Sequence, residues 1–204
     1  MLLLVSLLAL AGFLLVALLR SNLVEVDVTL NAWSASIQTG GFTIVAVAIS
    51  NIFDTYLVIA ISLLVAAALC VKNYKRYSVL LFCAVAGDVL IVAATKTLIA
   101  SPRPISEILS QTGYSFPSGH VTGSIVFFGL LTYFAWQIWK SPIIKAVSSS
   151  LFLAVTCIVA FDRIYLNVHW LSDVIGASLL GAFWLTSVLL VFRHVETAKY
   201  FRAY

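Results

Sequence analysis

The sequence predicts an all-α, polytopic membrane protein with six transmembrane helices. Hydrophobic residues make up 62% of the 204 residues and charged residues only 10%, whereas a soluble domain carries about a quarter charged residues. The mean hydropathy is +1.09. The apolar residues also gather in runs of roughly 20, which is the length that crosses a bilayer as a helix.

We place the six spans in a single domain that covers residues 1–204. The first run has no charged region before it and is longer than the roughly 7–15 apolar residues of a signal peptide, so we expect an uncleaved helix. The expected spans are residues 2–19, 55–71, 77–98, 118–139, 146–166 and 170–192.

Residues 21–51, between the first two spans, are of mixed polarity. Polar residues alternate there with apolar ones, so we expect an interfacial amphipathic helix with Trp33 as its anchor. Gly40 and Gly41 are expected to break this helix. Residues 42–49 are apolar and are expected to extend toward the second span.

The positions of the Lys and Arg residues predict the orientation. Six spans bring both termini to one side, and that side carries eight Lys and Arg residues against four on the other. By the positive-inside rule the termini are cytoplasmic, and the opposite face looks toward a periplasm, the extracellular space or an organelle lumen. The net charge of +4 therefore reflects topology, and we expect no nucleic-acid partner. The eight are Lys72, Lys75, Arg76, Lys140, Lys145, Arg193, Lys199 and Arg202; the four are Arg20, Lys96, Arg103 and Arg163.

Three short stretches carry the chemistry of the chain: residues 96–104 (KTLIASPRP), 117–120 (PSGH) and 163–173 (RIYLNVHWLSD). The first follows the end of the third span, the second opens the fourth, and the third joins the fifth to the sixth. An even number of spans brings all three to the non-cytoplasmic surface. Ionisable residues are costly to place in an apolar chain, so the cluster predicts a functional site.

Five of these residues are suited to holding a phosphate group. Arg103 and Arg163 each offer a planar fork of donors to phosphate oxygens, and Lys96 adds a compact charge. Ser118 and Gly119 open a helix, where unpaired backbone N–H groups favour an anion. Together they provide donors for the charge that develops during phosphoryl transfer.

The two histidines and one aspartate are suited to cutting the phosphate ester. His169 and Asp173 are four residues apart and share one face of a helix, so the carboxylate can orient the ring and leave its other nitrogen free to attack phosphorus. His120 is then the general acid that protonates the leaving alkoxide and later activates water. The chemistry is hydrolysis of a phosphomonoester or pyrophosphate through a phosphohistidine.

The three stretches resemble the signature of the type 2 phosphatidic acid phosphatase (PAP2) superfamily. That signature is Lys, six residues, Arg-Pro; then Pro-Ser-Gly-His; then Ser-Arg, five residues, His, three residues, Asp. The resemblance implies a PAP2-like helical bundle with short interfacial helices, no metal, a lipid phosphate or pyrophosphate substrate, and the residue roles given above. One position departs from it, because Asp162 stands where the family has Ser; we expect Asp162 to pair with Arg163 and orient the guanidinium.

Each residue also has an ordinary interpretation when taken alone. Lys96 and Arg103 resemble interfacial anchors that snorkel, and His120 and His169 resemble histidines that join helices by hydrogen bonds. The joint spacing favours catalysis. A metal site would lack a third protein ligand and would lie among three cations, so we expect no metal and no cofactor. The intramembrane Asp88 is expected to bond a neighbouring helix or to serve the site.

We expect a bacterial inner-membrane lipid phosphatase whose partners are membrane lipids and a lipid phosphate substrate. Phosphatidylglycerophosphate, undecaprenyl pyrophosphate and phosphatidic acid are the candidate substrates. A lipid phosphotransferase shares the first half-reaction and stays open. A non-catalytic lipid-binding or transport protein would have lost the nucleophile, its carboxylate or the acid, and all three are present.

Overall fold

The computed structural model is built from α-helices and one short 3-10 turn. It describes the backbone of residues 1–202 and the side chains of residues 1–196, and this part contains no strand. The all-helical prediction is therefore confirmed. The elements are α1 (Leu2–Leu19), η1 (Arg20–Asn22), α2 (Val24–Ser36), α3 (Gly40–Ile52), α4 (Thr55–Val71), α5 (Lys75–Ile99), α6 (Gly119–Ile138), α7 (Pro142–Tyr165) and α8 (Leu171–Arg202).

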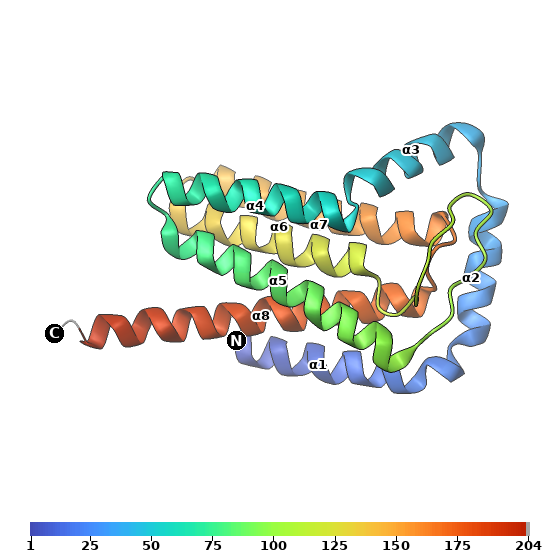
Figure 1. The fold of residues 1–204 in the computed structure, drawn as a ribbon, viewed down its shortest axis with the longest axis horizontal. Coiled ribbons are helices and arrows are strands. Elements are labelled where there is room, and N and C mark those ends of the chain that lie inside the picture. Colours follow the sequence, from blue (N-terminus) through green and yellow to red (C-terminus); the bar gives the residue numbers. More distant parts are fainter. Residues whose placement is uncertain (203–204) are drawn as a thin grey trace.

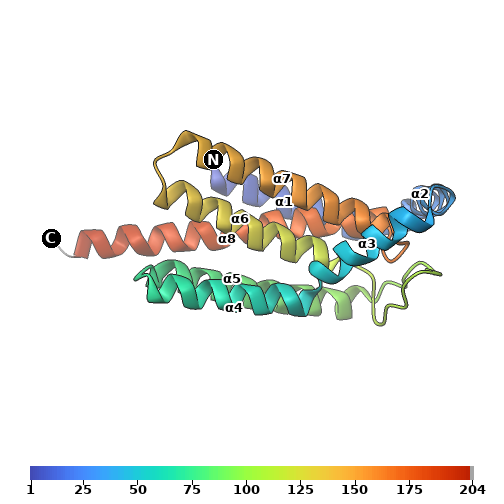
Figure 2. The same cartoon turned by 90° about the horizontal axis from the view of Figure 1, so that it is seen from above.

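Helices α1 and α4 to α8 run roughly side by side, and α2 lies across one end of the bundle (Figure 1). Helix α8 packs against α1 and α6, α6 also packs against α7, and α4 packs against α5. Seen from above, α4 and α5 form one side of the bundle and α7 lies on the other (Figure 2). The loop of residues 100–118 crosses the end of the bundle where α2 lies.

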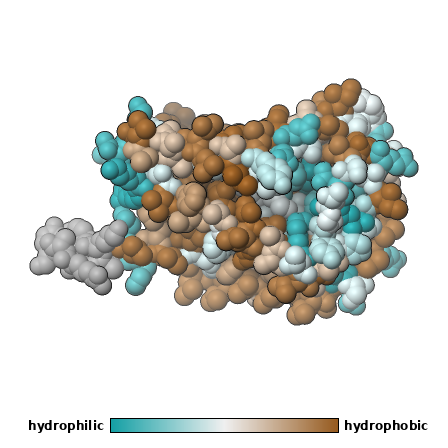
Figure 3. All heavy atoms as spheres, viewed as in Figure 1, coloured by the Kyte–Doolittle hydropathy of each residue, from teal (hydrophilic) through white to brown (hydrophobic). Residues whose placement is uncertain are grey.

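The outside of the bundle is apolar, as expected of helices that face lipid. Leu64, Leu98 and Ile143 are all more than 70% exposed, and a brown belt separates polar regions near the two ends of the molecule (Figure 3). The inside is packed around buried residues of α5 and α6 such as Leu81 and Leu130. The chain is thus an integral membrane protein.

In the described part of the chain, five helices are long and apolar enough to cross a membrane, and a sixth span is reached only if the bent pair of α3 and α4 counts as one. Helix α4 coincides with the expected span 55–71, but its 17 residues are short for a bilayer. It passes the test for a span only together with α3, to which it is joined at a bend of 49°. The expected break at Gly40 and Gly41 is wrong: these residues open α3, and the chain breaks just before them.

Two other boundaries differ from the sequence prediction. Helix α7 begins at Pro142, four residues earlier than expected, because Ser141 caps it by accepting a hydrogen bond from the Ile144 N–H and proline suits the first helical turn. Helix α8 continues past residue 192 to Arg202. The side chains of Lys199 and Arg202, which we counted for the orientation, lie outside the described residues.

Helix α2 turns its polar side inward, which is the reverse of an ordinary interfacial helix. Asp27 and Ser34 are buried, whereas Val24 and Val28 are exposed and Trp33 is half-exposed. The Asp27 carboxylate accepts hydrogen bonds from the N–H and hydroxyl of Ser172 at the start of α8. The Ser34 hydroxyl donates to the carbonyl of Ile164, near the end of α7. Helix α2 therefore binds both ends of the α7–α8 connection.

A pair of glycine substitutions tests the packing at this end of the bundle. A Cβ on Gly176 would overlap the ring of Phe116, which is fully buried, whereas a Cβ on Gly41 would meet nothing within 4 Å. We expect Gly176→Ala to lower the free energy of unfolding by about 1–3 kcal/mol through overpacking. Gly41→Ala is expected to be neutral or stabilising. Thermal unfolding in detergent measures the stability of both variants. Equal melting temperatures would contradict the close packing of Gly176 against Phe116.

Candidate active site

The three sequence motifs meet at the end of the bundle that α2 covers (Figure 1). Lys96 lies in the last turn of α5, Ser118 caps the start of α6, and Arg163 lies in the last turn of α7. His169 and Asp173 flank the start of α8.

His169 is held in one tautomer by the groups on its two ring nitrogens. Nδ1 lies 3.3 Å from Asp173 Oδ2, and Nε2 lies 3.2 Å from Nη1 of Arg103. Because a guanidinium can only donate hydrogen bonds, Nε2 must accept one. The ring proton is therefore on Nδ1, where it is donated to the carboxylate. Nε2 keeps its lone pair, which is the form of the ring that can attack phosphorus.

The environment of His169 also keeps the ring neutral. The side chain is 3% exposed, and this burial lowers its pKa from 6.5 to about 4. Asp173 opposes the shift, while the charges of Arg103 and Lys96 add to it. The imidazole is consequently unprotonated throughout the neutral range.

Arg103 and Lys96 bind the backbone of the loops around the site. Arg103 donates from Nε to the Gly113 carbonyl at 3.1 Å and from Nη1 to the Val168 carbonyl at 2.8 Å. Burial lowers the pKa of its guanidinium. Lys96 Nζ donates to the Tyr114 carbonyl at 2.6 Å. Both side chains are half-buried, and each retains donors beyond those bonds.

Arg163 is completely buried and pairs with its neighbour Asp162. One carboxylate oxygen, Oδ2, accepts from both Nε and Nη2 of the guanidinium. The expected pairing is present, so the acidic side chain orients Arg163. Among the described residues Asp162 Oδ1 has no hydrogen-bond partner.

The start of α6 offers donors that the protein does not use. Ser118 is fully buried, and its hydroxyl has no hydrogen-bond partner among the described residues. A buried hydroxyl normally finds a partner. Gly119 follows it as the first residue of α6, where the backbone N–H groups point out of the helix. This arrangement is suited to an anion.

His120 lies one residue further along α6 and is half-buried. The backbone of Ser50 lies within hydrogen-bonding range of its ring, and the charges of Arg163 and Arg103 act on it. On another side it lines a cavity of about 20 Å³ together with Asp88, which is room for about one water molecule. Asp88 is buried, and its Oδ1 has no partner in the described part of the chain.

Sequence reasoning missed two charged residues that support the site. Arg20 donates from Nη2 to Asp173 Oδ1 at 3.0 Å, and Asp27 binds Ser172 at the start of α8. The charge count placed Arg20 on the correct side, but no pattern links it to a partner 153 residues away. Asp27 was missed as well, because an acidic residue is ordinary in a segment that is expected to be interfacial.

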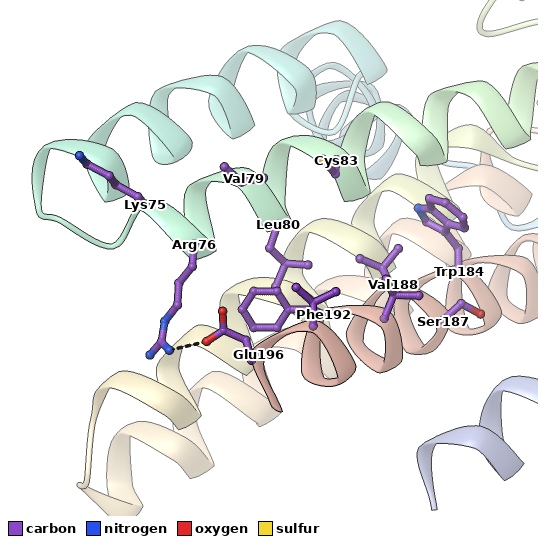
Figure 4. A pocket seen from close by; sticks show the side chains of 12 residues that line it. Lys75, Arg76, Val79, Leu80, Cys83, Trp184, Ser187, Val188, Phe192 and Glu196 are labelled. Carbon is purple, nitrogen blue, oxygen red and sulfur yellow. Dashed lines mark hydrogen bonds and ion pairs between the residues drawn. The ribbon is translucent and has the colours of Figure 1, made fainter. Parts of the chain in front are cut away.

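No three His, Cys, Asp or Glu side chains of the described residues converge as metal ligands. A cavity of about 610 Å³ lies at the opposite end of the bundle, between α5 and α8 (Figure 4). Its lining is mainly apolar, and the ion pair of Arg76 and Glu196 lies at its edge. None of the motif residues lines it.

The chain resembles several curated relatives and solved structures. It is 36% identical over 94 residues to an undecaprenyl-diphosphatase of Sulfolobus acidocaldarius, across 44% of this chain and 35% of that protein. It is 29% identical over 133 residues to phosphatidylglycerophosphatase B of Bacillus subtilis, across 63% of each. The chain thus matches between about one third and two thirds of the length of these relatives.

The solved structures cover more of the chain. A transmembrane PAP2-type phosphatidylglycerolphosphate phosphatase from Bacillus subtilis aligns with a TM-score of 0.85 at 20% identity, over 93% of this chain and 96% of that one. LpxE of Aquifex aeolicus aligns with a TM-score of 0.64 at 18% identity, over 80% of this chain and 94% of that one. At these identities the likeness establishes the fold alone. The profile of the PAP2 superfamily matches residues 77–196, more than half of the chain and all three motifs, and the protein therefore belongs to the PAP2 superfamily.

Proposed function

We propose that the protein is a lipid phosphatase that hydrolyses the phosphomonoester or pyrophosphate of a membrane lipid through a phosphohistidine. The observation that carries the proposal is the state of His169, whose Nε2 lone pair faces Arg103 while Asp173 holds Nδ1. Nε2 attacks phosphorus, and the bond from phosphorus to the leaving oxygen breaks. Water then attacks the phosphohistidine, releases inorganic phosphate and restores the ring.

The remaining motif residues divide the other tasks. His120 donates a proton to the leaving oxygen in the first step and takes a proton from the attacking water in the second. The phosphate oxygens are held by Lys96, Arg103, Arg163, Ser118 and Gly119. In favour of this role, the Ser118 hydroxyl is buried without a partner at the start of α6, and the cations retain donors beyond their present bonds.

An apolar cavity adjoins the small cavity beside His120 and offers room for part of a lipid tail. It has a volume of about 300 Å³, lies between α4 and α5, and is lined by residues such as Leu63 and Phe82. It shares Ile59, Val85 and Val89 with the small cavity beside His120. A lipid tail placed there lies in the hydrocarbon region while its phosphate reaches the charged end of the bundle.

The proposal includes a topology. Helices α3 and α4 together form the second of six spans in one domain over residues 1–204, the termini are cytoplasmic, and the site faces the outside of a bacterial inner membrane. The names of the relatives make undecaprenyl pyrophosphate and phosphatidylglycerophosphate the first substrates to test, with phosphatidic acid as the third.

Phosphate release from these three lipids, measured in detergent with EDTA, tests the function. We expect release that EDTA does not inhibit and that His169→Ala abolishes. Asp173→Asn is expected to lower kcat by about 10³- to 10⁴-fold, as when the carboxylate partner of a catalytic histidine is replaced. Loss of activity in EDTA would contradict the mechanism. Loss of substrate without phosphate release would indicate transfer to another acceptor, and intact substrate throughout would indicate a binding protein.

The phosphohistidine itself is tested by His120→Ala with p-nitrophenyl phosphate, whose leaving group departs without help from an acid. Loss of the general base slows hydrolysis of the intermediate, so we expect a burst of p-nitrophenol of about one equivalent and a ³²P-labelled protein that is labile in acid. The double variant with His169→Ala is expected to show neither. An unlabelled His120→Ala protein that still turns over would contradict this division of roles.

The protonation of His169 is tested by ¹⁵N NMR of histidine-labelled protein, with the signal assigned by its loss in His169→Gln. We expect Nδ1 to carry the proton and the ring to stay neutral until the pH falls to about 4. Between pH 6.5 and 4 the unfolded chain binds a proton that the folded protein does not, so this group makes stability fall as the pH is lowered through that range. A titration midpoint of His169 at or above pH 6 would contradict the lowering of its pKa by burial.

A further inference from the structure

Arg20 contacts the catalytic carboxylate from the far end of the sequence. It begins η1, directly after α1, and its Nη2 lies 3.0 Å from Asp173 Oδ1. We propose that Arg20 is a positioning residue, which holds the Asp173 carboxylate in place so that Asp173 can orient His169. The inference rests on the proposed phosphatase function and adds to it a residue outside the three motifs.

The two oxygens of Asp173 have separate partners. Oδ2 lies 3.3 Å from His169 Nδ1 and accepts the Trp170 N–H at 2.9 Å. Oδ1 accepts from Arg20 and, at 3.3 Å, from the Ser115 hydroxyl. A carboxylate anchored on Oδ1 cannot rotate away from the imidazole. The contact with Arg20 therefore fixes the direction from which Oδ2 meets the ring.

The charge of Asp173 is a second reason to assign Arg20 a positioning role. Asp173 has no exposed surface, and a buried carboxylate without a counter-ion is strongly destabilising. The neutral His169 does not supply that counter-ion. Lys96 and Arg103 lie within electrostatic range, but we assign both to the phosphate. When substrate is bound, Arg20 is the cation that remains with Asp173.

The surroundings of Arg20 are built to hold a planar guanidinium. Its Cζ lies 4.4 Å from the centroid of the Phe116 ring, a distance at which a cation is attracted to an aromatic face. Phe116 is itself fully buried, stacks on Phe13 and lies against Gly176. The ring cannot move aside, so it fixes the plane of the Arg20 side chain, and a lysine would not stack in the same way.

A cavity beside Arg20 makes chemical rescue possible. It has a volume of about 380 Å³ and lies between the α1–α2 connection and the start of the 100–118 loop, with Arg20 and Trp170 in its wall. A small guanidinium ion can enter there when the arginine side chain is removed. Rescue separates the charge and hydrogen bonds of Arg20 from a general effect on folding.

The test measures phosphate release by Arg20→Gln and Arg20→Ala. Because Asp173 acts on the nucleophile and not on substrate binding, we expect kcat to fall by roughly 10- to 100-fold, as for a small misplacement of a catalytic group. KM and the inhibition constant of inorganic phosphate are expected to stay within about threefold of wild type, as for a group that acts in the transition state. Millimolar ethylguanidinium is expected to restore kcat in Arg20→Ala and not in His169→Ala.

Arg76→Gln is the matched control, because it breaks an arginine–carboxylate pair of 2.7 Å at the opposite end of the bundle. It is expected to keep the wild-type kcat, and thermal unfolding is followed for every variant. A wild-type kcat in Arg20→Gln would overturn the inference and leave the phosphatase proposal intact. A folded Arg20→Ala protein whose lost activity ethylguanidinium does not restore would also overturn it. A wild-type protein that releases no phosphate would overturn the proposed function and the inference together.

Discussion

The buried carboxylate of Asp173 is the group on which the rest of the site depends. It has no exposed surface, so every lone pair that it turns toward the protein needs a donor. Those donors come from the end of α1, the loop of residues 100–118 and the chain just before α8. The site therefore exists only when these segments have docked, and its geometry is a property of the whole end of the bundle.

Helix α2 is part of the same arrangement. This helix turns its polar side toward the protein because its polar side chains find hydrogen-bond partners there. Asp27 caps the start of α8 through Ser172, and Ser34 binds the carbonyl of Ile164 at the end of α7. These bonds hold the ends of the segment that carries His169. A segment that looks like a surface anchor in the sequence thus fixes both ends of the connection that carries His169.

The sequence predicted the elements that depend on local pattern and missed those that depend on distant contacts. The apolar runs at residues 2–19 and 55–71 end where α1 and α4 end, because the change from apolar to polar residues at each end is a local signal. The motif spacings led correctly to residues that converge. Arg20 could not be assigned, because its partner is 153 residues away and a single arginine after an apolar run is also what an interfacial anchor looks like. The bend between α3 and α4 was missed because both helices are apolar. Hydropathy shows that a segment is apolar but not the direction in which its helix runs.

Under the proposed function, the pairing of charges lets a phosphate enter the site without breaking an ion pair of the protein. Arg163 is occupied by Asp162, and Arg20 by Asp173. In the described part of the chain, Lys96 and Arg103 form no ion pair and donate only to carbonyls and to His169. Two uncompensated cations suit a phosphate monoester, whose charge approaches about −2 at neutral pH.

Asp162 takes part in the same distribution of charge. With the serine of the superfamily signature at this position, Arg163 would add a third uncompensated cation and strengthen the attraction for every phosphate, the released product included. The aspartate keeps the Arg163 guanidinium in a fixed plane while removing its net charge. Under the proposed function, Asp162 therefore shifts Arg163 from electrostatic attraction toward directed hydrogen bonding, and leaves most of the attraction for phosphate to Lys96 and Arg103.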